Sequence, residues 1–501
     1  MKDKIEVFEY NKRISTTKSI ANSATVLSVS KFTVLIISIV IAMLLSRFLT
    51  LEEFGTYSQI HLVINIVTTI FLLGLPNSIN FFLASAETAK EKQEFLSTYY
   101  TLNTILCLIT GLFLIILTPL IVSYFNNILI KNFIYVLAVY PWAKIIIASI
   151  ENVLVIYQKT RHLMFFRFLN SILLLLNILI VYFFNLSFSI FMFLFVIIEF
   201  IFSLSVYFIV SNLSGKLKPF IDKFLVIKIL KFSIHLGLAS VIGTLSIELD
   251  KIVIGRVFDT EQLAIYTNAA REMPVTILAV SITAVLMPQL VRLLKNGYND
   301  EAIKLWGSAT LLSYIAICYF ATVLFVFAPQ VITLFYTDKY IAGVPIFRVY
   351  CIVLLLRSTY FGIILNSIGK TKYIFYSSMA SLFLNLILNY ILYLFLGFVG
   401  PAIATFISII IIAILQLIVS SKSINISFKK ILPWKTIGLV TVINLIMGLL
   451  ISYLKNIVPI DIYINELIEF ILLCFFWGLI YLLVTLKLIR QQWALLNVKY
   501  Y

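Results

Sequence analysis

The sequence predicts an all-α integral membrane protein of about 14 transmembrane helices, built as two pseudo-symmetric six-helix lobes followed by two further helices. Three observations predict this fold class: an apolar composition, a series of span-length apolar runs, and an internal repeat. Of the 501 residues, 62% are hydrophobic and only 12% are charged, and the mean hydropathy is +1.07. Soluble domains carry roughly 25% charged residues, so the composition excludes an ordinary soluble protein.

Apolar runs of about 20 residues, the length that crosses a bilayer as a helix, follow one another along the chain. Continuously apolar stretches such as Ile172–Phe184 favour helices over the alternating strands of an outer-membrane barrel. The predicted spans are residues 19–47, 57–84, 95–124, 130–156, 164–184, 189–211, 229–256, 262–290, 303–328, 342–366, 373–396, 400–420, 435–455 and 465–488.

Lys and Arg are distributed unevenly among the short polar connectors between these spans. They gather in both chain termini and in every second connector, which predicts that both termini are cytoplasmic. This asymmetry accounts for most of the net charge of +16, so no nucleic-acid partner is expected. We expect a multi-pass protein of the cell membrane whose surface is mostly covered by lipid.

The connectors are too short to hold a catalytic or ATP-binding domain, so the sequence predicts a transporter rather than an enzyme. A GxxxxGK[ST] phosphate loop does not occur, which argues against direct use of ATP. The four cysteines lie in separate apolar runs without the spacing of a metal site. We therefore predict no cofactor and no metal.

Three short motifs recur at a separation of about 210 residues, which is the signature of a duplicated unit. The matching pairs are Leu51–Tyr57 with Thr260–Tyr266, Leu75-Pro76 with Met287-Pro288, and Lys159–His162 with Lys370–Tyr373. Each unit holds an even number of helices, so both copies insert with the same orientation and form parallel repeats, a layout found in secondary transporters.

The spans and the repeat together predict how the chain is divided. The predicted parts are a cytoplasmic tail (1–18), an N-lobe with helices 1–6 (19–211), a cytoplasmic linker (212–228), a C-lobe with helices 7–12 (229–420), a cytoplasmic loop (421–434), helices 13–14 (435–488) and a cytoplasmic tail (489–501).

Four segments resemble the multidrug/oligosaccharidyl-lipid/polysaccharide flippase superfamily, and especially its polysaccharide transporter branch. They are Arg47–Tyr57, Asp250–Tyr266, Asn366–Lys372 and Gly397–Thr405. Ala264 departs from the family pattern, which usually has Gly at that position. The similar segments occur in both lobes, and the predicted helix count agrees over nearly the whole chain.

The resemblance implies a flippase for the repeat units of capsule, exopolysaccharide or O-antigen pathways. Its cargo would be an oligosaccharide linked to undecaprenyl pyrophosphate, a polyprenyl lipid, moved across the cytoplasmic membrane by alternating access. Glycosyltransferases and a polymerase of the same pathway are the implied partners, and H⁺ or Na⁺ is the implied coupling ion. The residues unaided reach only a two-lobed secondary transporter.

Charged side chains inside predicted spans are the candidates for cargo binding, because a charge in the membrane usually faces a bundle interior or a wet cavity. Lys31 and Arg357 have no acid on their own spans to neutralise them. Arg can hold phosphate oxygens in a bidentate manner, so these two cations are predicted to bind the pyrophosphate. Arg271 becomes a third candidate because helices 1, 2, 7 and 8 line the central cleft in the resembling family.

Three acids are candidates for ion coupling, namely Asp250, Glu272 and Glu199. The same residues could equally be buried hydrogen-bonded groups or ion-pair partners without a transport role. Lys144 and Glu151 are seven residues apart on one helix and are predicted to be a structural pair.

Pro76 and Pro288 are predicted to interrupt equivalent helices of the two lobes and to serve as hinges. Tolerated kinks without a function are the alternative. For the whole chain, a multidrug or cation extruder and a peptidoglycan lipid II flippase remain alternatives within the superfamily. An integral-membrane polysaccharide polymerase is the alternative from another class.

Overall fold

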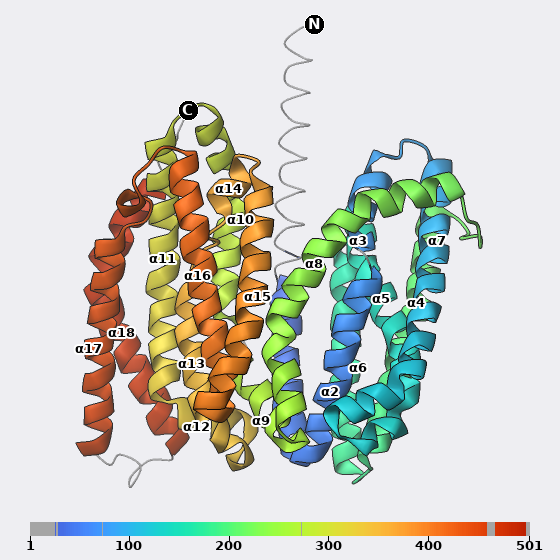
Figure 1. The fold of residues 1–501 in the computed structure, drawn as a ribbon, viewed down its shortest axis with the longest axis horizontal. Coiled ribbons are helices and arrows are strands. Elements are labelled where there is room, and N and C mark those ends of the chain that lie inside the picture. The colour runs from blue at the N-terminus through green and yellow to red at the C-terminus, as the bar shows by residue number, and fades with distance from the viewer. Residues whose placement is uncertain (1–25, 27–28, 73, 272, 458–465, 497–501) are drawn as a thin grey trace, which may run out of the picture. The chain divides into compact units, whose positions relative to one another are not determined.

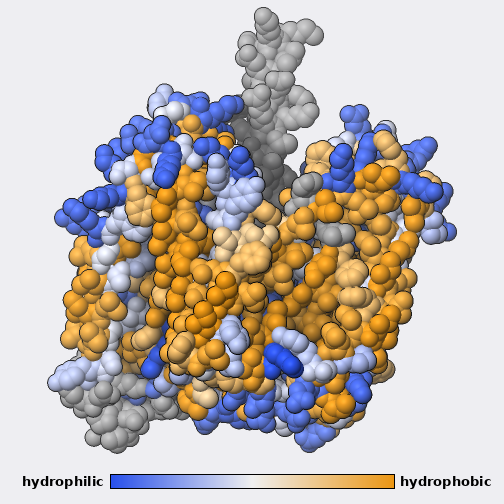
Figure 2. All heavy atoms as spheres, in the orientation of Figure 1, coloured by the Kyte–Doolittle hydropathy of each residue, from blue (hydrophilic) through white to orange (hydrophobic). Residues whose placement is uncertain are grey.

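The computed structural model describes residues 26, 29–72, 74–271, 273–457 and 466–496. The predicted N-terminal tail and Glu272 lie outside these residues. Helices make up almost all of the described chain (Figure 1), which confirms the predicted fold class. On the face drawn in Figure 2, hydrophobic side chains cover the middle of the helices and hydrophilic ones gather at the helix ends.

Within the described residues, 11 segments are long and apolar enough to cross a membrane, or up to 13 if each of two bent helix pairs counts as one span. The predicted number of 14 is therefore not confirmed. The longest segment, Thr371–Ser423, covers two predicted spans and contains the separate helices α15 and α16.

The chain divides into two compact units. Unit 1 holds residues up to Glu248 together with Phe258–Ala264. Its elements are a first helix (Val29–Phe48), α2 (Leu51–Leu72), α3 (Leu75–Ser78), the π-helix η1 (Ile79–Leu83), α4 (Ala89–Phe125), η2 (Ile128–Phe133), α5 (Ile134–Ile156), α6 (Thr160–Phe183), α7 (Phe188–Ser214) and most of α8 (Lys223–Val257).

Unit 2 holds Leu249–Val257 and the chain from Ile265 onward. Its elements are the end of α8, the second half of α9 (Thr260–Ala269), η3 (Pro274–Thr276), α10 (Ile277–Lys295), α11 (Asn299–Val326), α12 (Ala328–Tyr336), η4 (Asp338–Gly343), α13 (Val344–Leu356), α14 (Ile363–Ser367), α15 (Thr371–Leu396), η5 (Gly397–Val399), α16 (Gly400–Ser423), η6 (Phe428–Lys430), α17 (Trp434–Ile457) and α18 (Glu466–Leu496).

The predicted repeat is visible at the chain corners of the two units. The left-handed residues Gln158 and Asn185 of unit 1 correspond to Gly369 and Gly397 of unit 2, about 210 residues further on.

Polar side chains fix where several helices begin. Thr50 and Glu53 form a reciprocal pair of hydrogen bonds ahead of α2, with distances of 3.0 and 3.2 Å, and Thr88 and Glu91 form a capping box ahead of α4. Asp222 accepts from the backbone N–H groups of Phe224 and Leu225, which starts α8 within the segment predicted as a linker.

Helix α8, which the sequence places first in the predicted C-lobe, packs mainly within unit 1. Ile229 is fully buried in the unit 1 core, and the ring of Phe232 stacks on that of Phe81 with centroids 4.9 Å apart. Gly74 makes the close approach possible, since a Cβ there would lie 2.6 Å from the backbone N of Gly237.

Two predicted spans are broken. Helix α2 ends at Leu72, Gly74 is left-handed with φ 71°, and Pro76 lies in the first turn of α3, so the predicted interruption at Pro76 is present. The predicted interruption at Pro288 is wrong, because α10 continues through that residue. The break in this segment lies earlier, between the end of α9 and the start of α10.

Helices α17 and α18 pack on α11 and are part of unit 2. Trp477 of α18 is fully buried, and the Tyr481 hydroxyl donates to the Ile315 carbonyl at 3.0 Å. Asn444 of α17 donates to the Thr322 hydroxyl at 2.9 Å. Helix α18 runs to Leu496, beyond the predicted end at residue 488.

Candidate functional site

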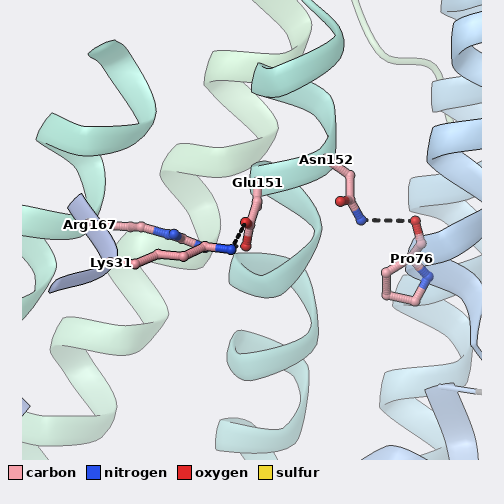
Figure 3. A network of polar contacts seen from close by, with 5 residues as sticks. All are labelled: Lys31, Pro76, Glu151, Asn152 and Arg167. Carbon is pink, nitrogen blue, oxygen red and sulfur yellow. Dashed lines mark hydrogen bonds and ion pairs between the residues drawn. The ribbon is translucent and has the colours of Figure 1, made fainter. Parts of the chain in front are cut away.

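Three helices of unit 1 meet in an ion-pair cluster of Lys31, Glu151 and Arg167 (Figure 3). Lys31 of the first helix lies 3.1 Å from one carboxylate oxygen of Glu151 on α5, and Arg167 of α6 donates to the other oxygen. One carboxylate therefore serves two cations, which leaves the cluster with net positive charge. The Lys31 side chain is 60% exposed and that of Glu151 is 30% exposed, so the charges are reachable from outside unit 1.

The cluster bears on two sequence-based expectations. Lys31 was predicted to have no acid on its own span, and Glu151 supplies one from a helix about 120 residues further along the chain. Lys144 and Glu151 were predicted to be structural residues on one face of a helix, and each has partners on other helices. Arg167 escaped notice although it lies in the predicted span 164–184, where the same intramembrane-charge rule applies.

The residue next to Glu151 reaches the break between α2 and α3. Asn152 Nδ2 donates to the backbone carbonyl of Pro76 at 2.9 Å (Figure 3). Neighbouring positions on α5 thus contact the cation cluster and the proline.

A second polar cluster in unit 1 is centred on Lys144 of α5. Its Nζ donates to Asn65 of α2, and the Asn65 amide donates to Glu248 of α8 at 3.4 Å. Lys144 also interacts electrostatically with Glu248 and Glu199. One half-buried cation therefore interacts with two acids that come from different helices, which is the arrangement expected where charges are kept inside a membrane protein.

The predicted coupling acid Glu199 is the deepest member of this cluster. It is 6% exposed and accepts a hydrogen bond of 3.1 Å from Asn170 of α6. His61 lies nearby on α2, packed edge-on against Tyr140 and Phe195.

The predicted coupling acid Asp250 is buried within unit 2, with 1% of its surface exposed. The Tyr266 hydroxyl donates to Oδ2 at 3.0 Å, and the Tyr350 hydroxyl donates to the same oxygen. The backbone N–H of Lys251 donates to Oδ1 at 2.8 Å. Both carboxylate oxygens thus have donors from their own unit.

Arg357 does not lie in the middle of an unbroken helix, as the sequence predicted. Helix α13 ends at Leu356, and Arg357 is its C-terminal cap, where its charge complements the helix dipole. The segment that follows Arg357 is hydrogen-bonded to α11, because the Trp306 indole and the Thr310 hydroxyl donate to Thr359 at 2.8 and 3.0 Å.

The predicted site residues are divided between the two units. Lys31, Glu199 and Pro76 lie in unit 1, whereas Asp250, Arg271, Arg357 and Pro288 lie in unit 2. Arg271 interacts electrostatically with the hydroxyl of Tyr336 on α12. The cluster that best combines exposure with surplus positive charge is that of Lys31, Glu151 and Arg167.

A family model described as "Polysaccharide biosynthesis protein" matches residues 44–345, which is more than half of the chain. The chain belongs to this family. Membership in the polysaccharide biosynthesis protein family confirms the resemblance inferred from the four sequence segments. No curated protein sequence matches this family member.

Solved structures confirm the fold of this polysaccharide biosynthesis family protein. A structure titled "Lipid II flippase MurJ, inward closed conformation" aligns with a TM-score of 0.71 and 18% identity, covering 93% of this chain and 99% of the other. An inward-facing multidrug resistance MATE family transporter of the MOP superfamily aligns with a TM-score of 0.62 and 17% identity, covering 78% and 94%.

A MOP superfamily transporter from Pyrococcus furiosus aligns with a TM-score of 0.54 and 15% identity, covering 81% of this chain and 96% of the other. At these identities the similarity establishes the fold that this family member shares with membrane transporters.

Proposed function

We propose that the protein is a flippase that carries oligosaccharide repeat units, linked to undecaprenyl pyrophosphate, across the cytoplasmic membrane for surface polysaccharide synthesis. The family match supports a role in polysaccharide biosynthesis, and the fold is that of transporters. The cargo head group enters a cleft open to the cytoplasm, the polyprenyl chain stays in lipid, and the lobes rock to release the sugars outside.

The observation that carries this proposal is the cation cluster in unit 1. A pyrophosphate needs fixed positive charge, and Lys31 and Arg167 supply two cations against one carboxylate. Glu151 is near the end of α5 and Arg167 is near the start of α6, and Lys31 lies beside them because it contacts Glu151. All three positions lie toward the end that the charge pattern predicts to be cytoplasmic, where the cargo is loaded.

The other candidate residues, from both parts of the chain, take the remaining proposed roles. Arg271 and Arg357 are proposed to contact the phosphates or sugars. Asp250, Glu272 and Glu199 are proposed to couple transport to H⁺ or Na⁺, and the breaks near Pro76 and before α10 are proposed to let the helices bend. Pathway glycosyltransferases and a polymerase supply and consume the cargo.

Replacement of both unit 1 cations tests the proposal. The Lys31→Ala/Arg167→Ala variant, expressed in cells that lack the original gene, is expected to insert normally but to abolish surface polysaccharide while lipid-linked units accumulate inside. Arg161→Ala is the matched control, because Arg161 is an exposed cation on the same helix as Arg167. Normal surface polymer with the double variant would overturn the assignment of the cluster.

The likeness to the MurJ structure over 93% of the chain favours lipid II as a second candidate cargo. A complementation assay separates the two. If the protein restores growth of cells depleted of their lipid II flippase but does not restore surface polysaccharide in its own deletion strain, the second candidate replaces the first.

A further inference from the structure

Glu151 stands out because both of its carboxylate oxygens are occupied by cations from other helices. Lys31 contacts Oε1 and Arg167 contacts Oε2. The ion pair of Lys90 with Glu94, by contrast, joins residues one turn apart on an exposed helix surface. The Glu151 pairs instead tie three helices together at a place that is partly open.

The donors that hold Glu151 are the donors that a diphosphate needs. A guanidinium presents a planar fork that fits two phosphate oxygens as well as two carboxylate oxygens, and an ammonium can contact either anion. A diphosphate carries more negative charge than a carboxylate and offers more acceptor oxygens. Glu151 and the head group therefore cannot both hold Lys31 and Arg167 fully, and they compete for the same two cations.

We infer that Glu151 is an exchangeable internal counter-ion, which a diphosphate head group displaces from Lys31 and Arg167 and which takes the two cations back when the head group leaves. This inference rests on the proposed function and specifies how the same site binds and releases its cargo. In the empty site Glu151 prevents the cost of leaving two cations without an anion inside a bundle of membrane-spanning helices. In the loaded site it weakens the hold on the cargo, which allows release on the other side.

The inference makes an unusual prediction for the Glu151→Gln variant. A purely structural ion pair would give weaker cargo binding when it is broken, because the cations would lose their fixed positions. If Glu151 competes with the cargo for the two cations, its removal strengthens cargo binding. We expect undecaprenyl diphosphate to bind the variant about tenfold more tightly than the unaltered protein, a difference of about 1.4 kcal/mol, and to dissociate correspondingly more slowly.

The experiment uses the full chain in lipid nanodiscs, with undecaprenyl diphosphate as the probe and inorganic pyrophosphate as a second probe without a lipid. Lys31→Gln and Arg167→Gln are each expected to weaken binding by about tenfold or more, whereas Glu151→Gln/Arg167→Gln returns the affinity toward that of the unaltered protein. Glu94→Gln, which breaks the exposed pair on α4, is the matched control and leaves the affinity unchanged. Thermal unfolding of each variant checks that it is folded.

The outcomes separate the inference from the proposed function. If the unaltered protein binds the diphosphate lipid and folded Glu151→Gln binds it equally or more weakly, the counter-ion inference is wrong while the flippase proposal stands. If the unaltered protein binds neither probe, both fail. If Glu151→Gln unfolds, Glu151→Asp replaces it: a shorter carboxylate that cannot reach both cations is expected to tighten binding, and weaker binding contradicts the inference.

Discussion

Asn152 donates a hydrogen bond to the backbone carbonyl of Pro76, one residue along α5 from the carboxylate that holds Lys31 and Arg167. The same carbonyl accepts the backbone N–H of Ile79, so it is satisfied within its own short helix as well. Through this contact the helix that carries Glu151 is joined to the break between α2 and α3. In the proposed transport cycle, this contact links cargo binding to helix bending through two neighbouring residues.

Asn152→Ala is expected to separate binding from transport. The loss of one hydrogen bond lowers stability by about 1 kcal/mol, since the Pro76 carbonyl keeps its bond from Ile79. Affinity for undecaprenyl diphosphate stays unchanged while the rate of flipping in proteoliposomes falls several-fold. Asn132→Ala, at an exposed position of η2, is the control. A flipping rate equal to that of the control would show that the contact has no role in the movement.

Lys144→Met is expected to destabilise unit 1. The variant removes the cation that interacts electrostatically with Glu199 and Glu248 and leaves both acids without it. The apparent Tm in detergent should fall clearly, and Lys144→Met/Glu248→Gln should recover part of the loss. The exposed Lys131→Met serves for comparison. An unchanged Tm for Lys144→Met contradicts the shared-cation arrangement.

Gly55→Ala is expected to disturb the start of α2. An added Cβ would overlap the backbone carbonyl of Thr260, which cannot swing away like a flexible side chain. The variant should therefore lower the Tm. Gly243→Ala in α8 should instead raise the free energy of unfolding by about 0.5–1 kcal/mol, because no atom lies near the added methyl and alanine favours a helix. Thermal unfolding of both variants is the test: Gly55→Ala should lower the Tm and Gly243→Ala should raise it. Shifts of the Tm in the same direction contradict the close contact.

Asp250→Asn and Asp250→Leu are expected to differ. Asparagine still offers an oxygen to the hydroxyls of Tyr266 and Tyr350, so the fold is kept while dependence of transport on an H⁺ or Na⁺ gradient is lost. Leucine leaves both hydroxyls without that acceptor, at a cost of about 1–3 kcal/mol each. The measurements are gradient-driven flipping and thermal unfolding. Retention of full gradient dependence by Asp250→Asn removes Asp250 from the coupling candidates.

The sequence predicts the helical spans well because long apolar runs have one stable conformation in a bilayer. It predicts the repeat because similar motifs recur at equivalent chain corners, as at Lys159–His162 and Lys370–Tyr373. Contacts between residues on different helices are harder to predict from the sequence. Nothing local to Lys31 indicates that Glu151 lies 3.1 Å away, and nothing local to Asn65 indicates that it bridges Lys144 and Glu248.

Helix breaks were predicted in part, for a physical reason. Pro76 follows Gly74, whose left-handed conformation ends a helix, whereas Pro288 has no such neighbour and is accommodated within α10. The break after Arg357 had a signal in the polar stretch Arg357–Tyr360 followed by Gly362. That stretch was included in a span because the residues on both sides are apolar.

The packing of α17 and α18 on α11 has a consequence for how the protein is made. Asn444, Trp477 and Tyr481 complete the surroundings of α11, yet they are synthesised more than 100 residues after it. Until Asn444 and Tyr481 have been synthesised, α11 lies in the bilayer without the hydrogen bonds from these two residues to Thr322 and to the Ile315 carbonyl. Unit 2 can therefore mature only when translation is almost finished, and premature termination before residue 434 should yield a product that quality-control proteases recognise.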